Sequence, residues 1–146
     1  ADPGNTGAMI RTALASGASG FLAVGTTDPW HPKAVRTSMG SLFKLSILRV
    51  TEQEDWLSEL HALSVETMAT SLDHAEPLPR VYPHGNRIAL VAGSEAFGLS
   101  PEVSDACRRR IKIPMPEGVD SFSVNAATAV MCYTLLQAEN GGMDET

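Results

Sequence analysis

Cysteine is scarce in this chain of 146 residues, which contains only Cys107 and Cys132. Two cysteines are too few for a disulfide framework. The chain also opens without a basic stretch followed by an apolar block, so nothing in it is typical of a secreted protein. Neither cysteine stands in a nucleophile motif, and we expect free thiols in a cytoplasmic protein.

Positive charge is also in short supply. The chain has eleven Lys and Arg residues and seventeen Asp and Glu residues, which gives a formal net charge of −6. This balance argues against a domain that grips nucleic acid through a broad positive surface. A local patch stays possible, and the densest candidate is Arg108, Arg109, Arg110 and Lys112, although such a cluster before an apolar strand is more often a solvated edge.

A long apolar run is absent. The longest uncharged stretch covers residues 121–138, but polar residues such as Ser123, Asn125 and Thr128 interrupt it. A bilayer span needs a more apolar run, so we expect a buried helix here and no membrane partner.

Nucleotide-binding loops and metal-ligand patterns are missing as well. Gly93 and Gly98 have the separation found in a phosphate loop, but Leu99, before Ser100, stands where the motif requires Lys, and no G-x-G-x-x-G occurs. The histidines lack metal-ligand spacing, so no metal is expected; they are His31, His61, His74 and His84.

What is present is the composition of one globular domain, with 43% apolar and 19% charged residues. Apolar runs predict strands at 21–24, 46–50, within 64–70, at 87–92 and at 110–113. Helices are predicted from Asn5 or Thr6 to Gly17, at 35–39, after a capping box at 51–54, from a Ser100 cap to 107, and at 123–139, with a loop at 73–85. This alternation predicts an α/β fold: a mostly parallel sheet with helices on both faces.

In such a sheet, ligands bind outside the carboxyl ends of the strands. Three segments therefore attract interest. In the first, Asn5, Gly7 and Arg11 stand among small residues near a helix start, where a cap and a solvated arginine are the simpler interpretation. In the second, Gly93 follows a strand and would let a ligand approach the backbone, with Glu95 close behind. In the third, residues 113–125 lead into the last helix, and Ser121 or Ser123 could merely cap it.

Together these segments resemble the SpoU, or TrmH-like, branch of the SPOUT RNA methyltransferases. The first motif is similar through Asn5, Gly7 and Arg11, and the stretch from Pro32-Lys33 to Ser38-Met39-Gly40 is similar too. The second motif is matched by Gly93-Ser94-Glu95 and Gly98-Leu99-Ser100, and the third by Ile113-Pro114-Met115 and Ser121-Phe122. Their order and spacing agree across nearly the whole chain.

The resemblance implies a SPOUT-like catalytic domain with a carboxyl-terminal trefoil knot, an exception to the rule that chains do not thread their own loops. It also implies a homodimer formed through the knot region and the last helix. That helix supports a dimer independently, because small or apolar groups wrap most of it: Ala127, Val130, Met131, Leu135 and Leu136.

The resemblance further implies transfer of a methyl group from S-adenosylmethionine to a ribose 2′-hydroxyl of rRNA or tRNA, leaving S-adenosylhomocysteine. Arg11 would stabilise the developing alkoxide or position a phosphate, since an arginine normally keeps its proton. The other implied catalytic residues are Asn5, Glu95, Ser121, Ser123 and Asn125. The implied cofactor-binding residues are Thr70, Gly93, Ile113, Met115 and Phe122.

The sequence departs from the family pattern at one position of the third motif. The family usually has Ser-Leu-Asn-Val, whereas this chain has Ser121-Phe122-Ser123-Val124, with the nearest amide at Asn125. Serine has a shorter reach and lacks the amide donor. An alternative is therefore an RNA-binding or ribosome-assembly module of the same fold with little or no catalysis.

Two further expectations concern the whole protein. The family's first strand and an amino-terminal RNA-binding domain usually precede the Asp2-Pro3-Gly4-Asn5 turn, so residues 1–146 are expected to be a single catalytic domain from the carboxyl-terminal part of a longer protein. RNA affinity would then lie mainly in the upstream part, with Arg11, Arg36 and the 108–112 cluster touching phosphates. An unrelated doubly wound nucleotide-binding protein is the remaining alternative.

Overall fold

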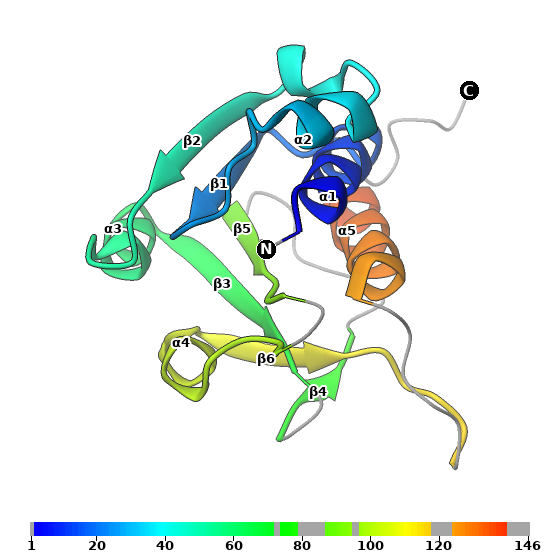
Figure 1. The fold of residues 1–146 in the computed structure, drawn as a ribbon. Helices are drawn as coiled ribbons and strands as arrows, with labels where there is room; N and C mark the ends of the chain where they lie inside the picture. Colours follow the sequence, from blue (N-terminus) through cyan, green and yellow to red (C-terminus); the bar gives the residue numbers. More distant parts are fainter. Residues whose placement is uncertain (1, 72–73, 79–86, 95–96, 118–123, 140–146) are drawn as a thin grey trace. The chain divides into compact units, whose positions relative to one another are not determined.

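The computed structural model describes residues 2–71, 74–78, 87–94, 97–117 and 124–139. Within these ranges the chain forms an α/β fold, with α1 (Pro3–Ala15), β1 (Gly20–Val24), α2 (Pro32–Thr37), the short 3-10 helix η1 (Ser41–Phe43), β2 (Ser46–Val50), α3 (Trp56–Ala62), β3 (Val65–Thr70), β4 (Glu76–Pro77), β5 (Arg87–Val91), α4 (Pro101–Ala106), β6 (Arg109–Lys112) and α5 (Val124–Glu139) (Figure 1). The chain divides into two compact units, Ala1–Trp56 and Leu57–Thr146.

The first unit pairs β1 with β2 in parallel, with Phe21 opposite Ile47. One core cluster brings α1 and the η1 region together through Ile10, Ala13, Leu42 and Leu45, and Phe21 and Ile47 pack against it. Because β-strand side chains alternate between faces, Phe21 and Ala23 share the face of β1 that carries this core.

The second unit contains a four-stranded parallel sheet in the order β4-β6-β3-β5. On one face, Met68 and Ile111 are fully buried beneath Met131 and Leu135 of α5. On the other face, the buried Thr67 Oγ1 lies 2.8 Å from His61 Nε2 of α3 and accepts a hydrogen bond from the Arg108 N–H just after α4. The prediction of parallel strands covered by helices on both faces is confirmed for this sheet.

Helix α1 begins earlier than the sequence predicts. The Asp2 carboxylate caps the helix by accepting a 2.9 Å hydrogen bond from the Gly4 N–H, and Pro3 occupies the first turn. The prediction of Asn5 or Thr6 as the cap, with a turn before it, is therefore wrong. An aspartate followed by proline is itself a strong start signal, because proline needs no hydrogen-bond donor there and its backbone already fits the helix.

Other features of the fold also differ from the predictions. The bond between the Thr51 N–H and the Glu54 carboxylate expected of a capping box does form, but α3 starts only at Trp56. The loop predicted at 73–85 contains the two-residue strand β4, whose pairing with β6 no local pattern reveals. Helix α2 begins at Pro32, three residues before the predicted start, because His31 caps it through its ring.

The trefoil knot stays a prediction. Its tracing requires residues 79–86 and 118–123, which lie outside the described residues. No helix in the described part of the chain is both long and apolar enough to cross a membrane.

Helices α1 and α2 meet without an intervening side chain at Gly7. A Cβ atom there would lie 2.0 Å from Thr37 Oγ1 and 2.2 Å from the Ala34 carbonyl oxygen. We expect Gly7→Ala to lower the free energy of unfolding by about 1–3 kcal/mol, because overpacking must push the helices apart. Chemical denaturation measures this change.

The matched control is Gly4→Ala in the same helix. Its nearest neighbour would be the flexible Lys33 Cε at 3.2 Å, so the helix propensity of alanine should keep the free energy of unfolding unchanged or raise it. Equal effects of the two variants would contradict the tight crossing at Gly7.

Burial in α5 raises the pKa of the Cys132 thiol to about 11 from the ordinary value of 9.0. Below pH 9 the thiol is protonated in both the folded and the unfolded chain, and above pH 9 the unfolded chain deprotonates first. We therefore expect the free energy of unfolding to fall between pH 9 and 11, and Cys132→Ala to reduce that fall. An identical pH profile of both proteins, from thermal melts, would contradict this assignment.

Candidate active site

The described cofactor-binding candidates lie at or just after the carboxyl ends of three neighbouring strands. Thr70 ends β3 and pairs with Ile111 of β6, while Ala69 pairs with Val91 at the end of β5. Gly93 follows β5 by two residues, and Ile113 follows β6 directly. Thr70, Gly93, Ile113 and Met115 therefore leave the same edge of one sheet, where the sequence predicts a ligand site.

These four residues are each half-buried. Ile113 and Met115 offer apolar surface, Thr70 offers a hydroxyl, and the strand ends provide backbone groups beyond the last ladder positions. A pocket that holds an organic ligand needs this mixture of apolar walls and a few polar groups. These apolar and polar groups suit a cofactor that contains adenosine.

The loop after β5 is tightly closed around Gly93. The Gly98 N–H donates to the Ser94 carbonyl oxygen at 2.8 Å, and the Phe97 N–H lies 3.2 Å from Ser94 Oγ. A Cβ atom on Gly93 would lie 2.1 Å from the Gly98 carbonyl carbon. The space beside Gly93 is thus filled by the chain itself, rather than left open for a ligand as expected from the sequence.

This closure also exposes an aromatic ring that the sequence did not single out. Phe97 is 91% exposed, one residue before Gly98, whose φ of +64° is a conformation that favours glycine. The ring is therefore almost fully exposed to solvent.

Asn5 and Arg11 lie on α1 in the first unit. Arg11 is exposed and forms no ion pair with another residue in the described part of the chain, whereas Asn5 is half-buried. Asn125 is half-buried in the first turn of α5. Glu95, Ser121, Phe122 and Ser123 lie outside the described residues, so their roles stay predictions.

The basic residues at 108–112 do not form one cluster, because successive side chains of β6 point to opposite faces of the sheet. Arg109 pairs with Glu66 at 3.7 Å and also contacts Glu76, while Arg110 contacts Asp105 of α4 on the opposite face. A pocket of about 440 Å³ lies among these groups, lined by His74, Glu76, Asp105, Cys107, Arg108, Arg109 and Arg110. Since carboxylates already hold two of its arginines, we interpret these groups as a structural network.

Burial raises the pKa of the Cys107 thiol, and a hydrogen bond with Thr67 lowers it by a smaller amount. A thiol that keeps its proton is a poor nucleophile. Both cysteines are free in the structure, as the sequence predicts. No group of His, Cys, Asp and Glu able to hold a metal ion occurs among the residues that the structure describes.

Fold and site together define an α/β protein of parallel sheets with a candidate ligand edge at the carboxyl ends of β6, β3 and β5. The SpoU rRNA Methylase family matches residues 1–133. The chain belongs to this family, and the resemblance found in its motifs is confirmed.

Individual relatives agree with this assignment. The chain is 31% identical over 135 residues to the 23S rRNA (guanosine(2553)-2′-O)-methyltransferase RlmP of Bacillus subtilis, covering 92% of this chain and 54% of that protein. It is 34% identical over 145 residues to the 23S rRNA (uridine(2479)-2′-O)-methyltransferase of Streptomyces viridochromogenes, covering 95% and 50%. The chain therefore spans about half the length of these curated relatives.

A solved structure is similar as well. The AdoMet-bound rRNA methyltransferase from Sinorhizobium meliloti superimposes with a TM-score of 0.83 at 34% identity, covering 93% of this chain and 52% of that one. This similarity confirms the α/β architecture, and it leaves the roles of the individual site residues as predictions.

Proposed function

We propose that this chain is the catalytic part of an S-adenosylmethionine-dependent RNA methyltransferase that modifies a ribose 2′-hydroxyl in rRNA or tRNA. The observation that carries the proposal is the gathering of Thr70, Gly93, Ile113 and Met115 at one sheet edge in a member of the SpoU family. The names of the relatives support the reaction and the RNA class.

Thr70, Ile113, Met115 and the backbone near Gly93 would hold the cofactor. S-adenosylmethionine, when bound, supplies an activated methyl group on a sulfonium. The remaining requirement is a ribose oxygen made nucleophilic and held in line with that methyl group.

Arg11 meets that requirement through its charge. With the cofactor bound, the hydroxyl would release its proton to water as its oxygen attacks the methyl carbon, and the S–CH₃ bond would break to leave neutral S-adenosylhomocysteine. Negative charge would develop on the oxygen as the proton leaves. A guanidinium near that oxygen stabilises the charge, or holds the neighbouring phosphate so that the ribose is in place. Asn5 would position the ribose side, and Glu95, Ser121, Ser123 and Asn125 would orient polar groups near the reacting atoms.

Calorimetric titration of S-adenosylmethionine into this chain tests the proposal at its first step, with S-adenosylhomocysteine and ATP as comparisons. Saturable binding of the first two alone is expected, followed by incorporation of labelled methyl groups into rRNA or tRNA. Binding without methyl transfer to any RNA would favour the non-catalytic module suggested by Ser123. Binding of ATP alone would contradict the proposal.

We also propose that the protein acts as a homodimer in the cytoplasm. Met131 and Leu135 are buried in the core of their own unit, which removes them from the predicted contact surface. The exposed residues Ala126, Val130 and Tyr133 follow each other at helical spacing along α5 and leave an apolar stripe for a second copy. The two free thiols agree with a reducing compartment.

Tyr133→Glu is expected to convert the dimer into a monomer, because a carboxylate cannot be buried unpaired in such a contact. Sedimentation equilibrium measures the mass. A wild-type chain that is already monomeric at high concentration would contradict the dimer.

A further inference from the structure

The first unit carries a segment that differs in charge from the rest of the chain. Residues 29–51 contain four Lys and Arg side chains and no Asp or Glu, although the whole chain has a net charge of −6. Residues 1–56 hold five basic and five acidic side chains, so the entire acidic excess falls on residues 57–146. A polyanion is therefore repelled least by the first unit.

Helix α2 and the 3-10 helix η1 present most of this charge to solvent. Lys33, Arg36 and Lys44 are all exposed. Lys33 lies 3.8 Å from Asp2, with both side chains more than half exposed, which is a weak pairing that a ligand can replace. Arg36 and Lys44 form no ion pair with any residue in the described ranges.

Large apolar side chains stand between these charges. Trp30 is 50% exposed, Met39 70% and Phe43 78%. Aromatic residues make up only 5% of the chain, so two exposed aromatic rings within this short stretch are more than its composition would give. We use the name α2–η1 surface for the exposed basic and large apolar residues from Trp30 to Lys44: Trp30, Lys33, Arg36, Met39, Phe43 and Lys44.

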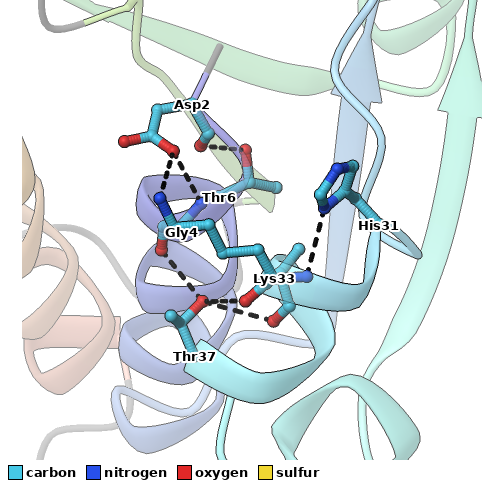
Figure 2. A network of polar contacts seen from close by, with 7 residues as sticks. Asp2, Gly4, Thr6, His31, Lys33 and Thr37 are labelled. Atoms are coloured by element: carbon cyan, nitrogen blue, oxygen red, sulfur yellow. Dashed lines mark hydrogen bonds and ion pairs between the residues drawn. The ribbon is translucent and has the colours of Figure 1, made fainter.

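The α2–η1 surface is held firmly against the helix that carries Arg11. Thr37 Oγ1 of α2 donates to the Gly4 carbonyl oxygen of α1 at 2.9 Å, and Lys33 forms an ion pair with Asp2; both contacts are drawn in Figure 2. Together with the close crossing at Gly7, these contacts fix α2 on α1. Met39 has a φ of +53°, an uncommon conformation for a residue with a side chain, and Gly40 follows at +84°.

Exposed rings between lysines and arginines suit a single-stranded nucleic acid. Positive side chains follow its phosphates, and unstacked bases lie on aromatic rings. The segment carries no Asp or Glu, so it offers no carboxylate to the basic side chains of a protein partner, whereas a polyanion needs none. We propose that the α2–η1 surface docks a single-stranded segment of the substrate RNA and so delivers its ribose to Arg11. This inference rests on the proposed function for the identity of the RNA as substrate.

The test measures binding of a fluorescein-labelled 20-nucleotide single-stranded RNA to this chain by anisotropy, over a range of salt concentrations and without cofactor. Arg36→Gln with Lys44→Gln is expected to weaken binding about tenfold near 0.1 M salt. It should also reduce the slope of log K against log salt by about 1.4, since each lost phosphate contact on a single strand accounts for about 0.7.

The apolar half of the surface has a different signature. Trp30→Ala with Phe43→Ala is expected to weaken binding about tenfold or more by removing two stacking platforms, while the salt slope stays unchanged. The matched controls are Arg87→Gln and Leu63→Ser, which remove an exposed charge and an exposed apolar side chain from the second unit. Both controls should bind RNA as the wild type does.

Several results would overturn the inference. They are controls that weaken binding as much as the surface variants, surface variants that bind normally, and a wild-type chain that binds no RNA. A Phe43 variant that changes the sedimentation mass would assign the surface to a protein interface instead. Selective binding to vesicles containing anionic lipid, with no selective binding to RNA, would assign it to a membrane.

The two proposals fail separately in this design. Absence of cofactor binding or methyl transfer with normal, surface-dependent RNA binding would reject the enzyme and keep the docking surface. Methyl transfer that is unaffected by all surface variants would keep the enzyme and reject the docking surface.

Discussion

Replacing Arg11 by alanine is expected to slow methyl transfer to RNA by about 10²–10³-fold, because the developing alkoxide loses the positive charge that stabilises it. The affinity for S-adenosylmethionine should stay the same, since the proposed cofactor-binding residues are Thr70, Gly93, Ile113 and Met115. The melting temperature should also stay close to that of the wild type, because Arg11 is exposed and has no ion pair with another described residue. Single-turnover kinetics with labelled cofactor measure the rate.

Arg49→Ala is the matched control for Arg11. It removes an exposed arginine of β2 in the same unit. The Nη1 atom of Arg49 lies 3.8 Å from Asp28 Oδ1. If both variants lose activity equally, the effect is one of general charge and not of Arg11. An Arg11 variant with a normal rate at saturating RNA and cofactor would remove this residue from the chemistry.

Replacing Gly93 by alanine is expected to weaken S-adenosylmethionine binding at least about tenfold, because a shift of the loop by a fraction of an ångström is costly at a binding site. The new Cβ atom would lie 2.1 Å from the Gly98 carbonyl carbon and 2.3 Å from the Leu99 nitrogen. Backbone atoms cannot rotate away as a side chain can, so Gly93 and the Gly98–Leu99 backbone must move apart. We also expect a loss of about 1–3 kcal/mol in the free energy of unfolding.

Gly20→Ala separates this effect from the general cost of adding a methyl group to a strand end. At Gly20 the nearest atom to a new Cβ is the Ser46 carbonyl oxygen at 3.4 Å, an ordinary contact. Calorimetry on both variants measures cofactor affinity, and thermal melts measure stability. A Gly93 variant that binds the cofactor normally would show that the closed loop has no part in the site.

The sequence predicted the element types well where local signals agree. The strand at 46–50 was predicted with its exact bounds, and Ser100 caps α4 as predicted, because its Oγ accepts a hydrogen bond from the Val103 N–H. Its errors occurred where a short polar stretch permits several helix starts, as at Asp2, or where pairing comes from a distant strand, as for β4 with β6. The predicted catalytic residues Glu95, Ser121 and Ser123 lie outside the described residues and stay predictions.

Sequence alone determined the class of secondary structure, the family and the residue types available for chemistry, because periodicity, caps and motif spacing are local properties. Only the tertiary structure decided which residues share a surface. It placed Thr70, Gly93, Ile113 and Met115 at one edge, since parallel strands align their carboxyl ends. It also split Arg109 from Arg110 by the alternation of β6, and it set Gly7 against Thr37, thirty residues away, because packing partners are chosen by the fold and not by distance along the chain.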